Sequence, residues 1–390
     1  MAAPRSGLSA QVMTTIETTV NTYAAPTHGL WLLPGESLKR DQGKYTSDAI
    51  IATRQLPDSA QHFAGNESLK GTLPLELTDN GAEDALTMLL GVPVKTGSNP
   101  YTRTWAGLLD LYGVSATMQI GRPDNAGNVD PFTWTGAKAT AGTFGLTESK
   151  PVTLNLETVA MNETLYRTVA DAVTNTDTSL TSATAAFTQD DKGKAISGTG
   201  IPPATTIASV TNATTVVLSA ATTATATGVT IVVGVATASA AYTSGMKPFT
   251  FIGGTTSNTS VTVGGATPPA IKAATLKIDR PQDTDRRGVG SGRILQPIVN
   301  DLASVKLEFE CEFDGYTHYK RYIEDSEHAA VLTLVSPANN TLTFTMNGYY
   351  EMPTEPVVAD RGILKQKIAL NMSNTTDAGA FTAVLVNTTA

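Results

Sequence analysis

The chain has almost no cysteine and no long apolar run. Cys311 is the single cysteine in 390 residues, so no disulfide can form within the chain, which fits synthesis in a reducing cytoplasm. Residues 1–20 lack the charged and apolar segments of a signal peptide, and no apolar run reaches the ~18 residues of a membrane span. We therefore expect neither export nor membrane insertion, and we expect Cys311 in the core.

Charged residues are also scarce, and their balance is acidic. They make up 16% of the chain, and 27 Lys and Arg against 35 Asp and Glu give a formal net charge of −8. Tight binding to nucleic acid phosphates requires a cationic surface, which this composition does not supply. Specific DNA binding is therefore disfavoured.

Residue patterns typical of catalysis and metal binding are missing as well. The glycine-rich stretch Gly288–Gly292 lacks the lysine and the following helix of a phosphate-binding loop. Ordinary surface polarity is the simpler interpretation of the one cluster with potential metal ligands, which is His318, Glu324, Glu327 and His328. We expect no catalytic residue, no cofactor and no metal, so the chain is not predicted to be an enzyme.

The sequence does contain many short alternating apolar runs separated by Gly, Pro, Asn and Asp. This is the pattern of an antiparallel β protein with few helices. At 390 residues the chain is long enough for two or three domains with cores of their own. We therefore predict a mainly β fold with more than one domain.

Similar elements follow one another in the same order twice. The first copy consists of Ser37–Lys39, a polar loop, the strand Gly71–Leu77 and the helix Asn80–Leu90. The second consists of Thr275–Ile278, a polar loop, the strand Val305–Phe313 and a shorter helix, Asp314–Ile323. A competing register aligns Ala116–Pro123 with Ala274–Pro281, which share Ala, Thr, Ile, Arg and Pro. We prefer the first register, because it keeps the element order, and it predicts a duplicated domain.

The helix Asn80–Leu90 has the clearest boundaries. Asn80 can cap its first turn, Glu83 is placed to complete a capping box, and Gly91 with Pro93 ends it. Its apolar residues fall on one face. We expect that face to pack on a sheet.

Composition divides the chain into four parts. We expect an N-terminal arm at 1–25, a first domain at 26–173, a small all-β module at 174–236 and a second domain at 237–390. The arm is rich in Thr and nearly featureless, and the module is rich in Ala, Thr, Val and Gly with little charge. Within the first domain, Asp41–Asn66 is a polar loop too long for an ordinary connection, so we expect it to make a contact.

Several of these segments resemble one known family. Leu33–Arg40, Leu69–Leu77, Met88–Gly91, Gln119–Asp124 and Phe132–Gly136 look like the tail tube (major tail) proteins of long-tailed, non-contractile phages, and among them those of phages that infect actinobacteria. In addition, the segment from Ala186 to Val233 resembles a small β module attached to many phage structural proteins.

The resemblance implies two tandem β-sandwich or barrel-like domains, each with one flanking helix, plus the inserted module. It implies a virion tail protein, made in the host cytoplasm, whose rings stack into a tube for genome ejection. Three chains per ring would suffice for a duplicated domain, while six remain an alternative. The implied partners are other copies of the chain, the tape measure protein, and tail terminator and distal tail proteins. DNA would pass through the lumen without specific binding.

Five acidic residues are candidates for the lumen wall. Alternation places Glu308, Glu310 and Glu312 on one face of a strand, and Glu76 with Asp79 is the weaker counterpart in the first copy. A negative wall would limit adsorption of DNA phosphates. An ordinary solvated strand face is the alternative interpretation.

A phage adhesin that binds a receptor or carbohydrate is the competing function. It would predict exposed aromatic residues at a loop tip. Trp31, Trp105 and Trp134 instead fall in apolar or strand contexts, so we expect them in the core.

Overall fold

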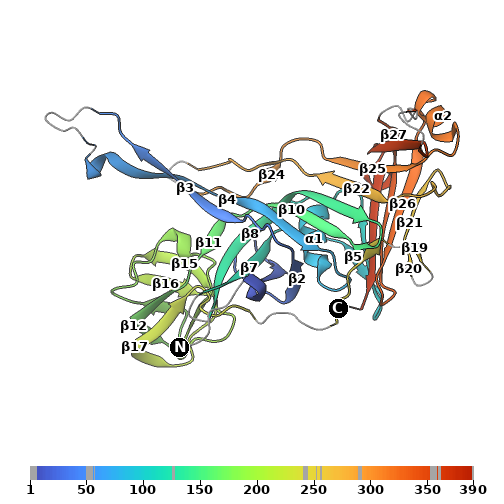
Figure 1. Ribbon diagram of the computed structural model, residues 1–390. Coiled ribbons are helices and arrows are strands. Elements are labelled where there is room, and N and C mark those ends of the chain that lie inside the picture. Colours follow the sequence, from blue (N-terminus) through green and yellow to red (C-terminus); the bar gives the residue numbers. More distant parts are fainter. Residues whose placement is uncertain are drawn as a thin grey trace.

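The structure is a computed structural model that describes residues 7–49, 56, 58–124, 128–239, 245–251, 253–254, 257–288, 292–351, 358 and 362–388. The described residues contain 29 strands and three α-helices, so the fold is mainly β, as the alternating runs predicted. Figure 1 shows a central body, a two-stranded hairpin that projects from it, and a separate small sheet beneath the hairpin.

The first half of the body is an antiparallel sheet. Its strands are β1 (Gln11–Ile16), β2 (His28–Leu32), β3 (Lys39–Thr46), β4 (His62–Glu76), β5 (Val94–Thr96), β6 (Tyr101–Ala106), β7 (Ala116–Pro123), β8 (Val129–Thr147), β9 (Lys150–Pro151), β10 (Thr153–Val159) and β11 (Asn162–Thr164). Six of these strands are joined by hydrogen bonds in the order β3, β4, β10, β8, β7, β1.

The second half has the same pairing order. Its strands are β18 (Thr250–Phe251), β19 (Gly253–Gly254), β20 (Ser257–Asn258), β21 (Ser260–Val263), β22 (Ala273–Asp279), β23 (Gln282–Asp283), β24 (Ile298–Val299), β25 (Ser304–Glu312), β26 (His328–Val335), β27 (Thr341–Tyr350), β28 (Lys365–Met372) and β29 (Phe381–Asn387). Pairing runs β22, β25, β28, β27, β26, β21. This order places β22 opposite β3, which is the preferred repeat register and not the competing one.

The two halves share one sheet and one core. β22 pairs with β8, and β29 pairs with β6, so strands of the second half continue the sheet of the first. A single cluster of buried apolar side chains extends from Val12 to Leu385. Trp105, Trp134 and Cys311 lie in it as expected, but Trp31 is 39% exposed, so its assignment to the core was wrong.

Helix α1 (Ala82–Leu90) lies inside the body. All nine of its residues are buried, including Glu83 and Asp84, so it packs on every side instead of on one face. Its N-cap is Gly81, with φ 114°, and not Asn80 as predicted, while the Glu83 carboxylate accepts the Gly81 N–H at 2.6 Å. Gly91 ends the helix as expected. The buried carboxylates have hydrogen-bond partners from both halves: Asp84 is bonded by Thr14 and His28 of the first half, and Glu83 is bonded by Asn387 of the second.

The other helices are short and peripheral. α2 (Thr317–Ile323) follows β25 as α1 follows β4, but only His318 of its residues is buried. α3 (Asp377–Ala380) precedes β29, and 3-10 turns occur at η1 (Gly7–Ser9), η2 (Ser59–Gln61) and η3 (Gln189–Asp191). The second half therefore has no buried counterpart of α1 among the described residues.

The N-terminal segment is not an arm in the described residues. Gln11–Ile16 forms β1, which pairs with β2 on one side and β7 on the other. Glu17 is buried, where its carboxylate accepts hydrogen bonds from Ser115 Oγ at 2.6 Å and from the Gly136 N–H at 2.9 Å. Thr-rich composition misled the prediction, because short threonine side chains suit a buried strand with hydrogen-bonding neighbours.

The small sheet has its own core. Its strands are β12 (Arg167–Asn175), β13 (Ser179–Thr181), β14 (Ile196–Gly198), β15 (Ile207–Asn212), β16 (Thr215–Leu218) and β17 (Thr225–Val233), and they form a six-stranded sheet over a second apolar cluster. β12 pairs with β17, so the boundary expected after Val173 falls inside a strand of this sheet. We refer to residues 167–233 as the small module.

Candidate functional site

A projecting hairpin takes up both ends of the expected polar loop. Asp41–Thr46 and His62–Asn66 belong to β3 and β4, which pair as an antiparallel hairpin (Figure 1). The part of the expected loop at 50–55 and 57 lies outside the described residues. Sequence missed the hairpin because both strands are exposed, so no apolar alternation marks them.

Two exposed aromatic side chains lie on this hairpin. Tyr45 and Phe63 face each other across β3 and β4, with ring centroids 5.7 Å apart and a 23° interplanar angle. They are 53% and 58% exposed. A Cβ at Gly65 would overlap the Tyr45 ring, so glycine leaves the space in which that ring lies flat. The pair gives the hairpin an apolar surface without a partner in the described part of the chain.

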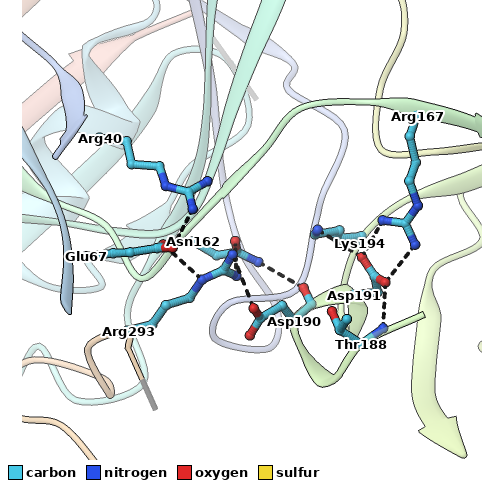
Figure 2. Close-up of polar contacts among 9 residues, drawn as sticks. All are labelled: Arg40, Glu67, Asn162, Arg167, Thr188, Asp190, Asp191, Lys194 and Arg293. Atoms are coloured by element: carbon cyan, nitrogen blue, oxygen red, sulfur yellow. Dashed lines mark hydrogen bonds and ion pairs between the residues drawn. The ribbon is translucent and has the colours of Figure 1, made fainter. Parts of the chain in front are cut away.

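The root of the hairpin is held by a loop from the second half. Glu67 accepts hydrogen bonds from Arg40 and from Arg293 Nε, the latter at 3.3 Å, and its own N–H donates to the Gly292 carbonyl at 2.7 Å. Arg287 Nη2 donates to the Glu67 carbonyl at 2.9 Å. Figure 2 shows Glu67 between the two arginine side chains. The hairpin is therefore fixed to the second half at its base.

The same arginine reaches the small module. Arg293 Nη1 donates to Asn162 Oδ1 at 2.6 Å, and Nη2 lies 3.4 Å from Asp190 Oδ2 (Figure 2). One side chain thus connects the hairpin, the first-half sheet and the module. Nothing in the sequence around Arg293 indicated this role, because its partners lie more than 100 residues away.

Asp191 organises the base of the module. Its carboxylate receives Arg167 Nη1 at 2.9 Å and Nη2 at 2.7 Å, Lys194 Nζ at 3.0 Å and the Thr188 N–H at 3.0 Å (Figure 2). Burial by itself would raise the pKa of Asp191, but these donors outweigh burial and hold the pKa well below its usual range. Residues 190–194 include four charged residues in a segment with little other charge, so the sequence did mark the position of this site.

The expected acidic face on β25 exists, but it is not uniformly acidic. Val305, Leu307, Phe309 and Cys311 are buried, and the glutamates alternate with them on the opposite face, as predicted. Lysines from β25 and β28 lie among those glutamates, in the pairs Lys306–Glu308 at 2.7 Å, Lys367–Glu308 at 3.1 Å and Lys365–Glu310 at 2.8 Å. Bonds from Lys306 and Lys367 lower the pKa of Glu308.

Glu76 and Asp79, the two lumen-wall candidates of the first half, lie in different surroundings. Glu76 is partly buried at the end of β4, and this burial raises its pKa. Asp79 is fully buried and accepts hydrogen bonds from Ser336 Oγ and Asn340 Nδ2, both at 2.8 Å. Its carboxylate therefore binds the second half and does not reach a solvent-filled channel, so Asp79 was wrongly assigned to a polar wall.

The histidine and glutamate cluster does not converge on a metal site. His318 Nδ1 lies 2.7 Å from the Tyr350 hydroxyl, and His328 Nε2 lies 2.9 Å from Ser326 Oγ. Within the described ranges no three His, Cys, Asp or Glu side chains are grouped as metal ligands. Gly288–Gly292 lies partly outside the described residues. Among the residues that the structure describes, no helix has the length and apolarity to cross a membrane.

Comparison with known proteins gives one family. A family model described as phage tail tube protein matches residues 7–217, which is more than half of the chain. The match covers the first half of the body, the hairpin and most of the small module. No curated protein matches the chain.

Proposed function

The chain belongs to the phage tail tube protein family; it is therefore a structural component of the virion tail, and we propose that it assembles into stacked rings that conduct the genome during ejection. The observation that carries the proposal is the single antiparallel sheet, which crosses both halves in the order β3, β4, β10, β8, β22, β25, β28, β27. Such a sheet can serve as one segment of a closed wall.

Three chains form each ring. The repeated pairing order supports a duplicated wall unit, so three chains supply six such units with pseudo-sixfold symmetry. The alternative is a ring of six chains, in which the second half decorates the tube. Electron microscopy of the purified protein, with mass per ring, decides between them. Isolated monomers at high concentration would contradict the tube itself.

The hairpin makes the contact between rings. It projects from the body, and its exposed Tyr45 and Phe63 offer an apolar surface to the neighbouring ring. Its base is fixed by Arg293, so the contact surface is held at a defined angle. β1, which was expected in an N-terminal arm at 1–25, belongs to the wall instead, because it pairs with β2 and β7.

The polar face of β22, β25 and β28 lines the lumen. It carries Glu308, Glu310 and Glu312 opposite the core, with Glu76 at its first-half edge. Asp79 is not part of this surface, because it is buried. The lysine partners keep the wall near neutral, and the glutamates prevent those lysines from holding DNA phosphates.

A pair of matched variants tests the lumen assignment. Replacing Glu308, Glu310 and Glu312 with glutamine removes three negative charges from this face, while Lys306 keeps its ion pair with Glu351 at 2.6 Å. The face then has a more positive charge, so particles should assemble but eject DNA more slowly. The control replaces Lys306, Lys365 and Lys367 with glutamine and should eject normally. Equal ejection by both variants would place this face outside the lumen.

The phage is long-tailed and non-contractile, with an actinobacterial host, and the chain is made in the host cytoplasm. The tube encloses a tape measure protein and ends on tail terminator and distal tail proteins. The small module lies on the outside of the tube.

An adhesin remains the second candidate function. Exposed aromatic residues at a loop tip were the mark expected of an adhesin, and Tyr45 and Phe63 on the projecting hairpin fit that expectation, since they are 53% and 58% exposed. The single aromatic of the small module, Phe187, is 3% exposed, which favours a structural role for the module. Binding of the isolated chain to host cells, in the absence of tubes, would favour the adhesin.

A further inference from the structure

Three titratable side chains of the second half meet beside α2. His318 of α2 is 3% exposed, and its Nδ1 lies 2.7 Å from the hydroxyl of Tyr350 on β27. The ring of His328, at the start of β26, packs against the same tyrosine, with centroids 5.8 Å apart and an interplanar angle of 73°. Two imidazole rings therefore lie against one buried phenol.

The contacts that hold α2 to the second half are largely polar. His318 is the only buried residue of this helix, and Tyr322 adds a partly buried ring against the core. The second anchor is Arg321, whose Nη1 donates to the Val263 carbonyl at 3.0 Å and whose Nη2 donates to the Gly264 carbonyl at 3.4 Å. The attachment of α2 therefore depends on the hydrogen bonds of His318 and Arg321 more than on a buried apolar face.

The backbone on either side of α2 permits the helix to move as a unit. Gly315 before it has φ 118°, and a Cβ at this position would meet no atom within 4 Å. Asp325 after it has φ 45°. Tyr316 and Ile323, at the two ends of the helix, are 72% and 61% exposed. A short helix between two such turns can leave the sheet without disturbing the strands.

The surroundings of His318 disfavour a positive charge on its ring. Burial lowers the pKa of His318, Asp314 at the end of β25 raises it, and Arg321 and His328 lower it again. The net result is a pKa below the ordinary value of 6.5. A proton on His318 would therefore place a second buried cation beside Arg321.

His328 is in a similar position. Burial and Arg321 lower its pKa, and Glu324 opposes them. The other titratable groups of the cluster stay neutral near pH 7, because burial raises the pKa of the Tyr350 hydroxyl and raises that of the Cys311 thiol to about 11. The two histidines are thus the groups of this cluster whose charge changes in mild acid.

We propose that His318 and His328 form an acid-sensitive latch, which keeps α2 docked on β27 while both imidazoles are neutral and releases it when they are protonated beside Arg321. A histidine whose pKa is lower in the fold than in the unfolded chain stabilises the fold fully above pH 6.5. This stabilisation is lost as the pH falls from 6.5 through the folded-state pKa. The latch is a property of the single chain and does not depend on ring formation.

The acid response should be confined to α2. In the first half, the bond from His28 to Asp84 raises the pKa of His28, so acid strengthens the surroundings of α1. Release of α2 would change the position of the exposed Tyr316 and Ile323 while the shared sheet stays intact. One corner of the second half would thus change its surface in mild acid.

Hydrogen exchange of the full chain, followed by mass spectrometry at pH 7.5 and 5.5, tests the latch. The reporters are the helical amides of Lys320 and Glu324, which donate to the Tyr316 and Lys320 carbonyls at 2.8 Å. After correction for the intrinsic exchange rate, protection of α2 should be ~5-fold lower at pH 5.5, because opening is coupled to proton uptake. Peptides from α1 should show no such loss. Equal protection of α2 at both pH values would overturn the latch, and so would an equal loss in α1.

Three variants separate titration from packing. His318→Gln combined with His328→Gln removes both titrating rings, so the pH effect on α2 should shrink to less than ~2-fold. Tyr350→Phe removes the hydroxyl that His318 contacts but leaves both imidazoles, so α2 should lose protection already at pH 7.5 and remain sensitive to acid. His62→Gln, on the exposed hairpin, should change neither property.

A ~5-fold acid effect that persists in the double glutamine variant would assign the response to other groups and overturn the latch. If the double variant does not fold, His328→Gln alone decides, because this ring is only partly buried and its loss should still reduce the acid effect. An unchanged effect in that variant, together with equal protection of α2 and α1 in the unmodified chain, would leave nothing for the latch to explain.

Discussion

Asp191 shows how one buried carboxylate fixes a whole substructure. Its side chain is 1% exposed and is bonded by Arg167 and Lys194. Because the pKa of Asp191 is lower in the folded chain than the ordinary carboxyl pKa of 3.8, its ionised carboxylate stabilises the fold at pH values above 3.8. This contribution is lost as the pH falls through the folded-state pKa. The module should therefore loosen only in strong acid.

We expect Asp191→Asn to lower the free energy of unfolding of the small module by ~3 kcal/mol, because it removes the buried counter-charge of two partly buried cations, Arg167 and Lys194. Denaturant unfolding at neutral pH measures this. The matched control is Asp190→Asn, whose carboxylate is 56% exposed and whose loss should cost at most ~1 kcal/mol. Equal effects of the two variants would contradict the role of Asp191.

His28 also contributes to the stability of the fold, and its contribution depends on pH in the opposite direction. Its Nδ1 lies 2.9 Å from Asp84 Oδ2, and this bond raises the pKa of His28 against the opposing effect of burial. Glu83 also raises it, and Arg103 lowers it. A raised pKa stabilises the fold fully below the ordinary value of 6.5, and the contribution is lost as pH rises through the folded-state value.

The thermal midpoint of the body should therefore fall as pH rises above about 6.5, and His28→Gln should remove most of that dependence. The control substitution is His62→Gln, on the exposed hairpin, which should leave the pH dependence of the thermal midpoint unchanged. A pH dependence that survives in His28→Gln would assign the effect to another group.

At the scale of elements, the hairpin is separable from the wall. Among the described residues, the base of the hairpin is bonded to the second half through Glu67, with Arg293, Arg287 and Gly292, while Tyr45 and Phe63 are exposed further out. Its outer part can therefore change without disturbing the core. Tyr45→Ala with Phe63→Ala should give folded protein that forms single rings but stacks poorly. Sedimentation and microscopy measure the lengths of the assemblies. Tubes of normal length would show that the aromatic pair does not make the ring contact.

At the scale of the whole molecule, the small module should be removable from the tube. Arg167 pairs with Val233, so its two ends are neighbours and a short glycine linker can replace residues 167–233. The shortened chain should still form tubes, seen by microscopy. Removal of residues 178–233 alone serves as the contrast. It leaves β12 in place without its partner β17, so β12 would have an unpaired edge and the protein should aggregate. Loss of tubes in a folded 167–233 deletion would place the module in the wall.

The sequence by itself determined the features that depend on local periodicity. The alternation in Val305–Phe313 fixed which side chains of β25 are buried, and Gly91 fixed the end of α1. Element order also gave the repeat, and the resemblance of its segments gave the family. These features follow from residues close together in the chain, which is why one sequence was enough to predict them.

Only the tertiary structure decided the features that depend on distant partners. Glu308 pairs with Lys367 because β25 lies beside β28, and Asp79 is buried by Ser336, which is 257 residues away. The hairpin and the junction at Arg293 likewise exist only once strands from both halves are adjacent. Periodicity states which side of a strand a residue occupies, but not which strand covers that side. The charge of the β25 face was therefore decided by the fold.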